Sequence, residues 1–279
     1  MPHAQRRLRR RRRRSPHDRR LHHAQDHHDP APQRHPLPTQ GPVAVDFSSI
    51  RAISFDCYGT LIDWESGILR AVRPVLSVRG LRPGDEAILE SYARLEALHE
   101  SGEYVDYREV LSRVMRDLAA EFGASLEDRE VERLPASLAA WPAFTDTPRS
   151  LRSLAARFPL IICSNVDADL FEATHEKLGA EFEWVVTADY CRSYKPHPRH
   201  LRVALALAGL QPHELLHVAQ SRFHDILPAR TLGIRTAWVN RESRLRDRGL
   251  TPPTPASPPP DLTVSDLEEL DRLLRTAGV

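Results

Sequence analysis

Four polar residues suited to nucleophilic chemistry each lie at or just beyond the end of an apolar, strand-like run. Asp56 and Ser164 come directly after two such runs, and Lys195 and Asp225 follow the next two. Carboxylate, hydroxyl and ammonium groups can take part in nucleophilic and acid–base chemistry when they are brought together. Taken singly, each residue also fits a turn, a helix cap or a solvated surface position. Their chemistry therefore depends on whether the fold brings them together.

The apolar pattern predicts a fold that would do this. A strand is expected over 50–55, and after Thr147 helical and strand-like segments alternate to the end of the chain. The further strands are expected over 160–163, 184–187, 216–219 and 236–239, with a last strand and helix within 262–275. Such alternation is typical of an α/β fold with a doubly wound parallel sheet, in which ligands bind outside the carboxyl ends of the strands.

Between Asp63 and Trp141 the pattern changes to helices alone. Apolar residues recur at helical spacing over 64–76, 88–98 and 110–122, and a shorter helix is expected near 131–140. An all-helical cap inserted after the first strand is therefore predicted. The expected domains are a tail over 1–42, a core over 43–62 and 145–279, and the cap over 63–144.

Composition sets the amino-terminal segment apart from the rest. Residues 1–40 hold eleven Arg, no Lys and three Asp with few apolar residues, which predicts a disordered tail. A basic run could bind nucleic-acid phosphates, but a solvated charge run is the favoured interpretation, so no nucleic-acid partner is expected. No run of about 18 apolar residues exists, so no membrane span is expected. The three cysteines lack zinc-type spacing, which fits a reducing, cytoplasmic compartment.

The motifs together resemble a known superfamily. Asp56-Cys57-Tyr58-Gly59-Thr60-Leu61, followed in order by Ser164-Asn165, Lys195-Pro196 and Asp225, is similar to the four-motif pattern of haloacid dehalogenase-like hydrolases over about residues 49–279. The resemblance implies a Rossmann-like core, a helical cap and Asp56 as a covalent nucleophile. Thr60 and Ser164 would donate hydrogen bonds to Asp56 or to a substrate carboxylate. Lys195 would hold Asp56 ionised, and Asp225 would position Lys195 or the hydrolytic water.

The residue two positions after the nucleophile distinguishes branches of this superfamily. Its phosphatases carry a second Asp there, whereas this chain has Tyr58, which is similar to the 2-haloacid dehalogenase branch. An alkoxide leaving group needs a proton and a halide does not. Gln220 replaces a carboxylate of the phosphatase magnesium site, so no metal or cofactor is expected.

The resemblance thus implies a hydrolase that dehalogenates a small 2-haloalkanoic acid through an aspartyl ester. One alternative is a magnesium-dependent phosphatase in which Asp56 and Asp225 hold the metal loosely. The other is a non-catalytic binding protein of the same fold. Related dehalogenases commonly pair, so a homodimer is also implied.

Substrate contacts are expected from four further residues: Tyr58, Asn165 as a halide contact, Ser221 and Arg94. Dehalogenases place an Arg on the second cap helix, where this chain aligns Ser91; Arg94 lies three residues on and would share its helical face. The alternative for Arg94 is a solvated side chain. The gap from Val218 to Asp225 is one residue longer than in the dehalogenase pattern and equals the phosphatase length. The nearby histidines and tryptophans are expected to be structural: His197, His200, His217, His224, Trp64, Trp184 and Trp238.

Overall fold

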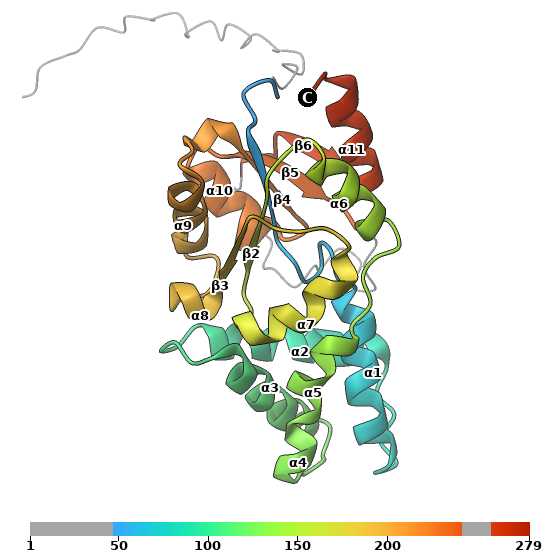
Figure 1. Cartoon of the computed structure of the whole chain (residues 1–279). Coiled ribbons are helices and arrows are strands. Elements are labelled where there is room, and N and C mark those ends of the chain that lie inside the picture. Colours follow the sequence, from blue (N-terminus) through green and yellow to red (C-terminus); the bar gives the residue numbers. More distant parts are fainter. Residues whose placement is uncertain (1–46, 242–257) are drawn as a thin grey trace, which may run out of the picture. The chain divides into compact units, whose positions relative to one another are not determined.

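A parallel sheet of six strands forms the centre of the residues that the computed structural model describes, which are 47–241 and 258–279. The strands lie in the order β3-β2-β1-β4-β5-β6, and every neighbouring pair is parallel (Figure 1). Their bounds are β1 Ala52–Phe55, β2 Leu160–Ser164, β3 Trp184–Thr187, β4 Leu215–Ala219, β5 Arg235–Val239 and β6 Leu262–Val264. The predicted α/β fold with a Rossmann-like, doubly wound sheet is thereby confirmed.

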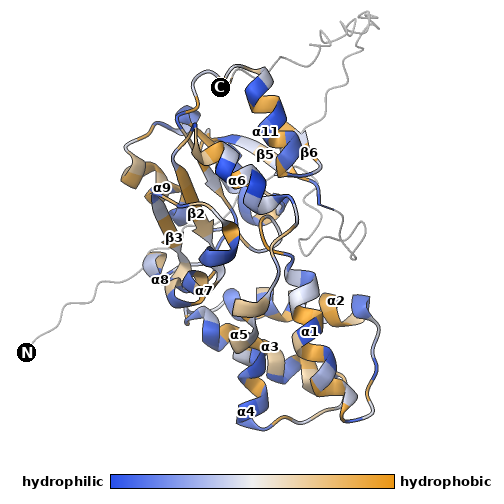
Figure 2. Cartoon of the chain, turned by 45° about the vertical axis from the view of Figure 1, so that its right-hand side comes forward, coloured by the Kyte–Doolittle hydropathy of each residue, from blue (hydrophilic) through white to orange (hydrophobic). Residues whose placement is uncertain are grey.

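Helices cover both faces of this sheet, because successive strand residues point to opposite sides. Ile161 of β2 belongs to one hydrophobic cluster with Leu201 of α9, whereas Ile162 belongs to another with Leu151 of α6 and Leu270 of α11. Strand β2 is buried along its length and largely hydrophobic in Figure 2, as expected for a strand covered on both faces. The elements of this part are α6 Thr147–Ala155, α7 Ala168–Leu178, α8 Ala188–Cys191, α9 Arg199–Ala208, η2 Pro212–Glu214, η3 Arg222–Ile226, α10 Leu227–Thr231 and α11 Leu267–Thr276.

Between β1 and β2 the chain forms only helices, as the apolar spacing predicts. They are α1 Trp64–Ser77, α2 Asp85–Glu100, α3 Tyr107–Glu121, α4 Asp128–Val131, α5 Arg133–Ser137 and the 3₁₀ turn η1 Leu138–Ala140. The single helix expected near 131–140 is wrong, since this stretch is divided among α4, α5 and η1. Pro135 explains the break, because it has no N–H to donate to the carbonyl of Val131.

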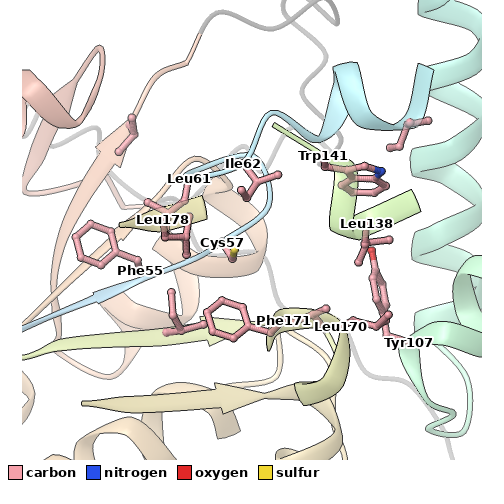
Figure 3. Close-up of a cluster of buried hydrophobic side chains, with 14 of the residues drawn as sticks. Phe55, Cys57, Leu61, Ile62, Tyr107, Leu138, Trp141, Leu170, Phe171 and Leu178 are labelled. Atoms are coloured by element: carbon pink, nitrogen blue, oxygen red, sulfur yellow. The ribbon is translucent and has the colours of Figure 1, made fainter. Parts of the chain in front are cut away.

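The inserted helices and the sheet share one hydrophobic cluster. It runs from Phe55 of β1 through Leu61 and Ile62 to Leu138 and Trp141 (Figure 3). The chain from Ala44 onward accordingly forms one compact unit, within which the boundaries drawn at 63 and 144 between core and cap stay a prediction.

Two expectations concern the ends and the surroundings of the chain. The predicted tail over 1–42 lies outside the described residues. Within the described ranges, no helix is both long and apolar enough to cross a membrane.

Candidate active site

Three of the predicted residues meet at one ammonium group at the carboxyl edge of the sheet. Lys195 Nζ donates hydrogen bonds to Asp56 Oδ1 and Asp225 Oδ1, both at 2.7 Å, and to the Cys163 carbonyl at 3.0 Å. Asp56 directly follows β1, Asp225 lies in η3 after β4, and Cys163 is near the end of β2. The fold therefore brings together side chains that are 139 and 30 residues apart in sequence.

Thr60 holds the second oxygen of Asp56. Its hydroxyl donates to Asp56 Oδ2 at 2.7 Å and accepts the Gln220 N–H at 2.9 Å, which ties the loop after β1 to the loop after β4. The turn that returns Thr60 to Asp56 depends on Gly59, whose φ of +97° disfavours any side chain. Both oxygens of the candidate nucleophile are thus held by donors.

His217, expected to be structural, extends this network through the interior of the sheet. Its Nε2 donates to Asp225 Oδ1 at 3.0 Å, and its Nδ1 lies 2.8 Å from the Ser54 hydroxyl, which donates to it. Ser54 and His217 are register partners on β1 and β4. Two polar residues at matching positions of otherwise apolar strands were the signal in the sequence that could have revealed this bridge. This Ser54–His217 bridge fixes the position of the Asp225 carboxylate.

Burial and mutual charge set the ionisation of the central residues. Burial opposes the charge of Lys195, but Asp225 and Asp56 outweigh it and raise the pKa of its ammonium above the usual 10.5. Burial would raise the pKa of Asp225, but the charge of Lys195 and the hydrogen bond from His217 hold it well below 3.8. For Asp56 burial prevails and raises the pKa from 3.8, against the opposing charge of Lys195. Asp225 and Lys195 are therefore a fixed ion pair, and Asp56 is the carboxylate with the greater proton affinity.

A π-helical turn positions Asp225. In η3 the N–H of Ile226 donates to the carbonyl of Ser221, five residues back, at 3.2 Å. A π turn holds one residue more than an α turn, and such turns are frequent at functional sites. This wider turn delivers the Asp225 carboxylate to Lys195, and it is consistent with the longer gap between Val218 and Asp225 that the resemblance predicts.

Above Asp56 lies a cavity of about 90 Å³. Its described lining consists of Asp56, Tyr58, Trp64, Tyr92, Ala93, Glu96, Ala97, Glu100, Tyr107, Trp141, Ser164, Asn165, Lys195, Gln220, Ser221, His224 and Asp225. All seven predicted site residues other than Thr60 and Arg94 belong to this lining. A cavity of 150 Å³ holds benzene, so this one suits a substrate of a few heavy atoms.

The predicted substrate contacts already have partners within the chain. Asn165 accepts the Lys195 N–H at 2.7 Å and donates to Glu100 Oε2 at 3.2 Å. The Tyr58 hydroxyl shares a 3.0 Å hydrogen bond with Thr174, and burial raises its pKa well above 10. These bonds hold Asn165 and Tyr58 in the wall, and the raised pKa makes the Tyr58 hydroxyl a weaker acid than a free tyrosine.

The structure does not bring Arg94 to the cavity. Its guanidinium pairs with Glu121 of α3, and the Ser91 hydroxyl donates to the same carboxylate. On α2 the side chains that line the cavity include Tyr92 and Glu96, four residues apart, and Arg94 lies between them on another side of the helix. The expectation that Arg94 contacts the substrate has no support in this geometry, because the cavity face of α2 is not the face of Ser91 and Arg94.

The cavity face of α2 carries the carboxyl groups of Glu96 and Glu100 instead, which was not predicted from the sequence. Glu96 Oε1 accepts hydrogen bonds from the Tyr92 hydroxyl at 2.8 Å and the Tyr107 hydroxyl at 2.5 Å. Burial raises the pKa of Glu96 from 4.5, and burial together with the charge of Glu96 raises that of Glu100 well above 4.5. The signal was the recurrence of Tyr92, Glu96 and Glu100 at intervals of four residues.

The donor set at this edge does not fit a magnesium ion. Magnesium takes oxygen ligands in near-ideal octahedral geometry, but Asp56 and Asp225 already share the Lys195 ammonium, and Tyr58 and Gln220 bring no carboxylate. Across 47–241 and 258–279, no group of three or more His, Cys, Asp or Glu side chains could hold a metal. The positive charge at the centre of the site is supplied by Lys195 itself.

Comparison with known proteins adds independent findings. A family model of haloacid dehalogenase-like hydrolases matches residues 50–233. An (S)-2-haloacid dehalogenase of Pseudomonas sp. (strain YL) is 27% identical over 82% of this chain and 96% of its own length. A phosphoglycolate phosphatase of Yersinia pestis is 28% identical over 68% of this chain and 80% of its own. The solved structure of an L-2-haloacid dehalogenase from Xanthobacter autotrophicus superimposes with a TM-score of 0.70 at 24% identity, covering 81% of this chain and 98% of that one.

Proposed function

We propose that this chain, which belongs to the haloacid dehalogenase-like hydrolase family, displaces halide from a carbon of a small substrate by attack of Asp56. The observation that carries the proposal is the environment of Asp56. Lys195 and Thr60 hold its two oxygens, and the residue two positions on is Tyr58, whose hydroxyl is committed to Thr174. This arrangement supplies an oriented carboxylate but, two positions after it, no carboxylic acid for a basic leaving group.

The reaction would proceed through two displacements. In the first, an Asp56 oxygen forms a bond to the substrate carbon while the carbon–halogen bond breaks and halide leaves with the electron pair. In the second, water attacks the Asp56 carboxyl carbon, which releases an alcohol and a proton and regenerates the carboxylate. Asp225 lines the cavity, and its Oδ2 is buried without a hydrogen-bond partner among the described residues, so it is the acceptor that would orient this water.

The head group of the substrate is less well supported than the reaction. A 2-haloalkanoic acid, expected from the resemblance and named in the relatives, would bring a carboxylate into the cavity. Lys195 is the sole cationic side chain among the described lining residues, and it is already bonded to Asp56 and Asp225. The geometry therefore supports the carbon–halogen chemistry, and Ser164, which also lines the cavity, is the predicted hydrogen-bond donor to a substrate carboxylate.

Chloride release tests the reaction. Full-length protein is incubated in EDTA with L-2-chloropropionate or 2-chloropropionamide, with Asp56→Asn as the control. We expect chloride release that the control lacks, and single turnover in ¹⁸O-water should place ¹⁸O in the Asp56 carboxylate. The alternative is a phosphatase, which the Yersinia pestis relative suggests. Magnesium-dependent release of phosphate from phosphoglycolate, without chloride release, would replace the proposal.

A further inference from the structure

We propose that Arg241 is a positioning residue for Asp56, because its guanidinium fixes the loop that carries Thr60 to the chain that returns from the inserted helices. The proposal deepens the proposed function and rests on it only for the reaction that the kinetic test follows. Arg241 lies two residues after β5 and does not belong to the described lining of the cavity. It therefore acts on the candidate nucleophile through other residues.

The guanidinium of Arg241 has three kinds of partner. Its Nε and Nη2 donate to the Thr60 carbonyl at 3.1 Å and 2.9 Å, and its Nη1 donates to Asp146 Oδ1 at 2.7 Å. Its central carbon lies 4.0 Å from the centre of the Phe144 ring, and the side chain is only 8% exposed. A planar guanidinium can direct two N–H groups at one acceptor while it stacks on a ring, which the compact ammonium of a lysine cannot do.

These partners lie on the two segments that join the inserted helices to the sheet. Thr60 lies between β1 and α1, whereas Phe144 and Asp146 lie between η1 and α6. The two segments are bonded to each other, because the Phe144 N–H donates to the Leu61 carbonyl at 3.0 Å. Asp146 in turn accepts the Leu267 N–H, at the start of α11, at 2.9 Å. Arg241 thus connects the nucleophile loop, through Asp146, to a helix that covers the sheet.

Thr60 transmits this contact to Asp56. Arg241 holds the Thr60 carbonyl, and the Thr60 hydroxyl donates to Asp56 Oδ2 at 2.7 Å and accepts the Gln220 N–H at 2.9 Å. Lys195 holds the other oxygen of Asp56. When the backbone of Thr60 moves, its hydroxyl moves with it, and the carboxylate loses one of the two donors that orient it. A misplacement of about 1 Å can lower the rate of a reaction between positioned groups about 100-fold.

Arg157 offers a matched control, because it has the same three kinds of partner elsewhere in the chain. It pairs with Asp271 of α11, donates to the main-chain oxygen of Val279, and its guanidinium carbon lies 5.6 Å from the centre of the Phe158 ring. None of these residues belongs to the described lining of the cavity. Arg157→Met therefore removes a similar set of contacts away from the nucleophile loop, and it measures what the loss of a mostly buried arginine does by itself.

Hydrogen exchange of the full-length protein tests the position of Thr60 without any turnover. The Gln220 amide donates to the Thr60 hydroxyl, and the Leu61 amide donates to a carbonyl within the same loop at 2.7 Å, so both exchange rates depend on this loop. In Arg241→Met we expect both amides to exchange at least tenfold faster than in the wild-type protein, measured by mass spectrometry. In Arg157→Met both rates should stay within about twofold of wild type.

Single-turnover chloride release from L-2-chloropropionate tests whether this contact matters for the attack of Asp56. Arg241→Met should lower the rate about 10- to 100-fold and change KM less than about threefold, because Arg241 acts on the nucleophile and lies outside the described lining. Arg157→Met should leave both values within about twofold of wild type.

The variant Thr60→Val shows whether Arg241 acts through the Thr60 hydroxyl. In the Thr60→Val background that hydroxyl is already lost, so Arg241→Met should lower the rate by less than about threefold. An equal loss in both backgrounds would mean that Arg241 acts by another route, and it would overturn the inference.

Arg241→Lys keeps a positive charge beside Asp146 but lacks the guanidinium fork. Its exchange and its rate should lie between those of the wild-type protein and Arg241→Met. If Arg241→Met does not fold, this conservative variant decides the question, and wild-type exchange and turnover in it would overturn the inference.

The outcomes separate this inference from the proposed reaction. Unchanged amide exchange in Arg241→Met overturns the inference whatever the protein does with chloride. Faster exchange in Arg241→Met but not in Arg157→Met, with no chloride released by the wild-type protein, supports the contact between Arg241 and Thr60 and refutes the reaction. Chloride release that depends on Asp56 and proceeds at the wild-type rate in Arg241→Met supports the reaction and overturns the positioning role.

Discussion

Replacing Lys195 with Met should expose how strongly the active site depends on one ammonium group. The methionine keeps most of the length and apolar stem of the lysine but removes the charge. Asp56 and Asp225 would then be left as buried carboxylates 7% and 1% exposed, without the cation that bonds to each at 2.7 Å. Removing one partner of a buried ion pair costs about 3–5 kcal/mol, and here two carboxylates lose the same partner.

The chain offers a matched control, because Lys177 is its one other lysine. Lys177 Nζ donates to the carbonyls of Ala139 and Trp141 and is only partly buried, so Lys177→Met leaves no buried charge behind. Loss of these bonds should cost about 1–2 kcal/mol. The difference between the two lysine variants therefore measures the buried charge rather than the loss of a lysine.

The pH dependence of the stability loss in Lys195→Met distinguishes the effect of the lost charge from that of lost packing. In the wild-type protein the pKa of Asp225 lies below its usual 3.8, so its pairing contributes stability above that pH and loses it as the pH falls below. In Lys195→Met the pKa values of Asp56 and Asp225 should rise instead, so the carboxylates destabilise the fold near neutrality and less as they protonate. The stability difference from wild type should accordingly shrink between about pH 8 and about pH 5.

Urea denaturation at both pH values measures these differences. A second variant sharpens the test: Asp225→Asn in the Lys195→Met background removes one of the stranded carboxylates and should restore about 1–2 kcal/mol. A loss below about 2 kcal/mol for Lys195→Met, or one that is equal at both pH values, would refute the reasoning, because lost packing alone would then explain it. Failure of the double variant to recover stability would refute it as well.

Three further outcomes follow from the same geometry. Gly67→Ala should lower the free energy of unfolding by about 1–3 kcal/mol in urea, because its Cβ would lie 2.3 Å from the Trp141 ring; unchanged stability would contradict that packing. Tyr58→Phe should keep turnover within about threefold, since its hydroxyl is bound to Thr174, whereas a loss of about 100-fold would assign it proton transfer. The single-turnover rate should rise with pH through a pKa above 3.8, since burial raises that of Asp56 and only the carboxylate attacks; a pKa at or below 3.8 would argue against it.

The core side of the site was predictable because strand order decides it. Asp56, Lys195 and Asp225 each follow a strand of a parallel sheet, and the fold brings such positions to one edge regardless of their separation in sequence. The sequence pattern therefore sufficed to group them. It did not by itself pair Ser54 with His217, because that contact depends on the register between β1 and β4, and through it His217 is held against Asp225.

The cap side was not predictable from the same pattern because it depends on how a helix is rotated. The spacing of apolar residues located α2, but Arg94 was placed on the cavity face by alignment with a residue that this chain lacks. Neighbouring helix positions are separated by a rotation of about 100°. A prediction that is wrong by two residues therefore places the wrong side chains, here Arg94 instead of Glu96, on the cavity wall. Tyr92 and Glu96 occupy the cavity face, and Arg94 pairs with Glu121.

The two halves of the cavity consequently have separate roles in the chemistry. Lys195 and Thr60 hold the carboxylate of Asp56 at the carboxyl ends of the strands, and Asp225 in η3 anchors Lys195. Other polar groups that face the substrate come from α2, whose Glu96 accepts hydrogen bonds from the hydroxyls of Tyr92 and Tyr107. Substitutions on the cavity face of α2 should therefore change which substrates bind while the ion pair beneath Asp56 stays intact.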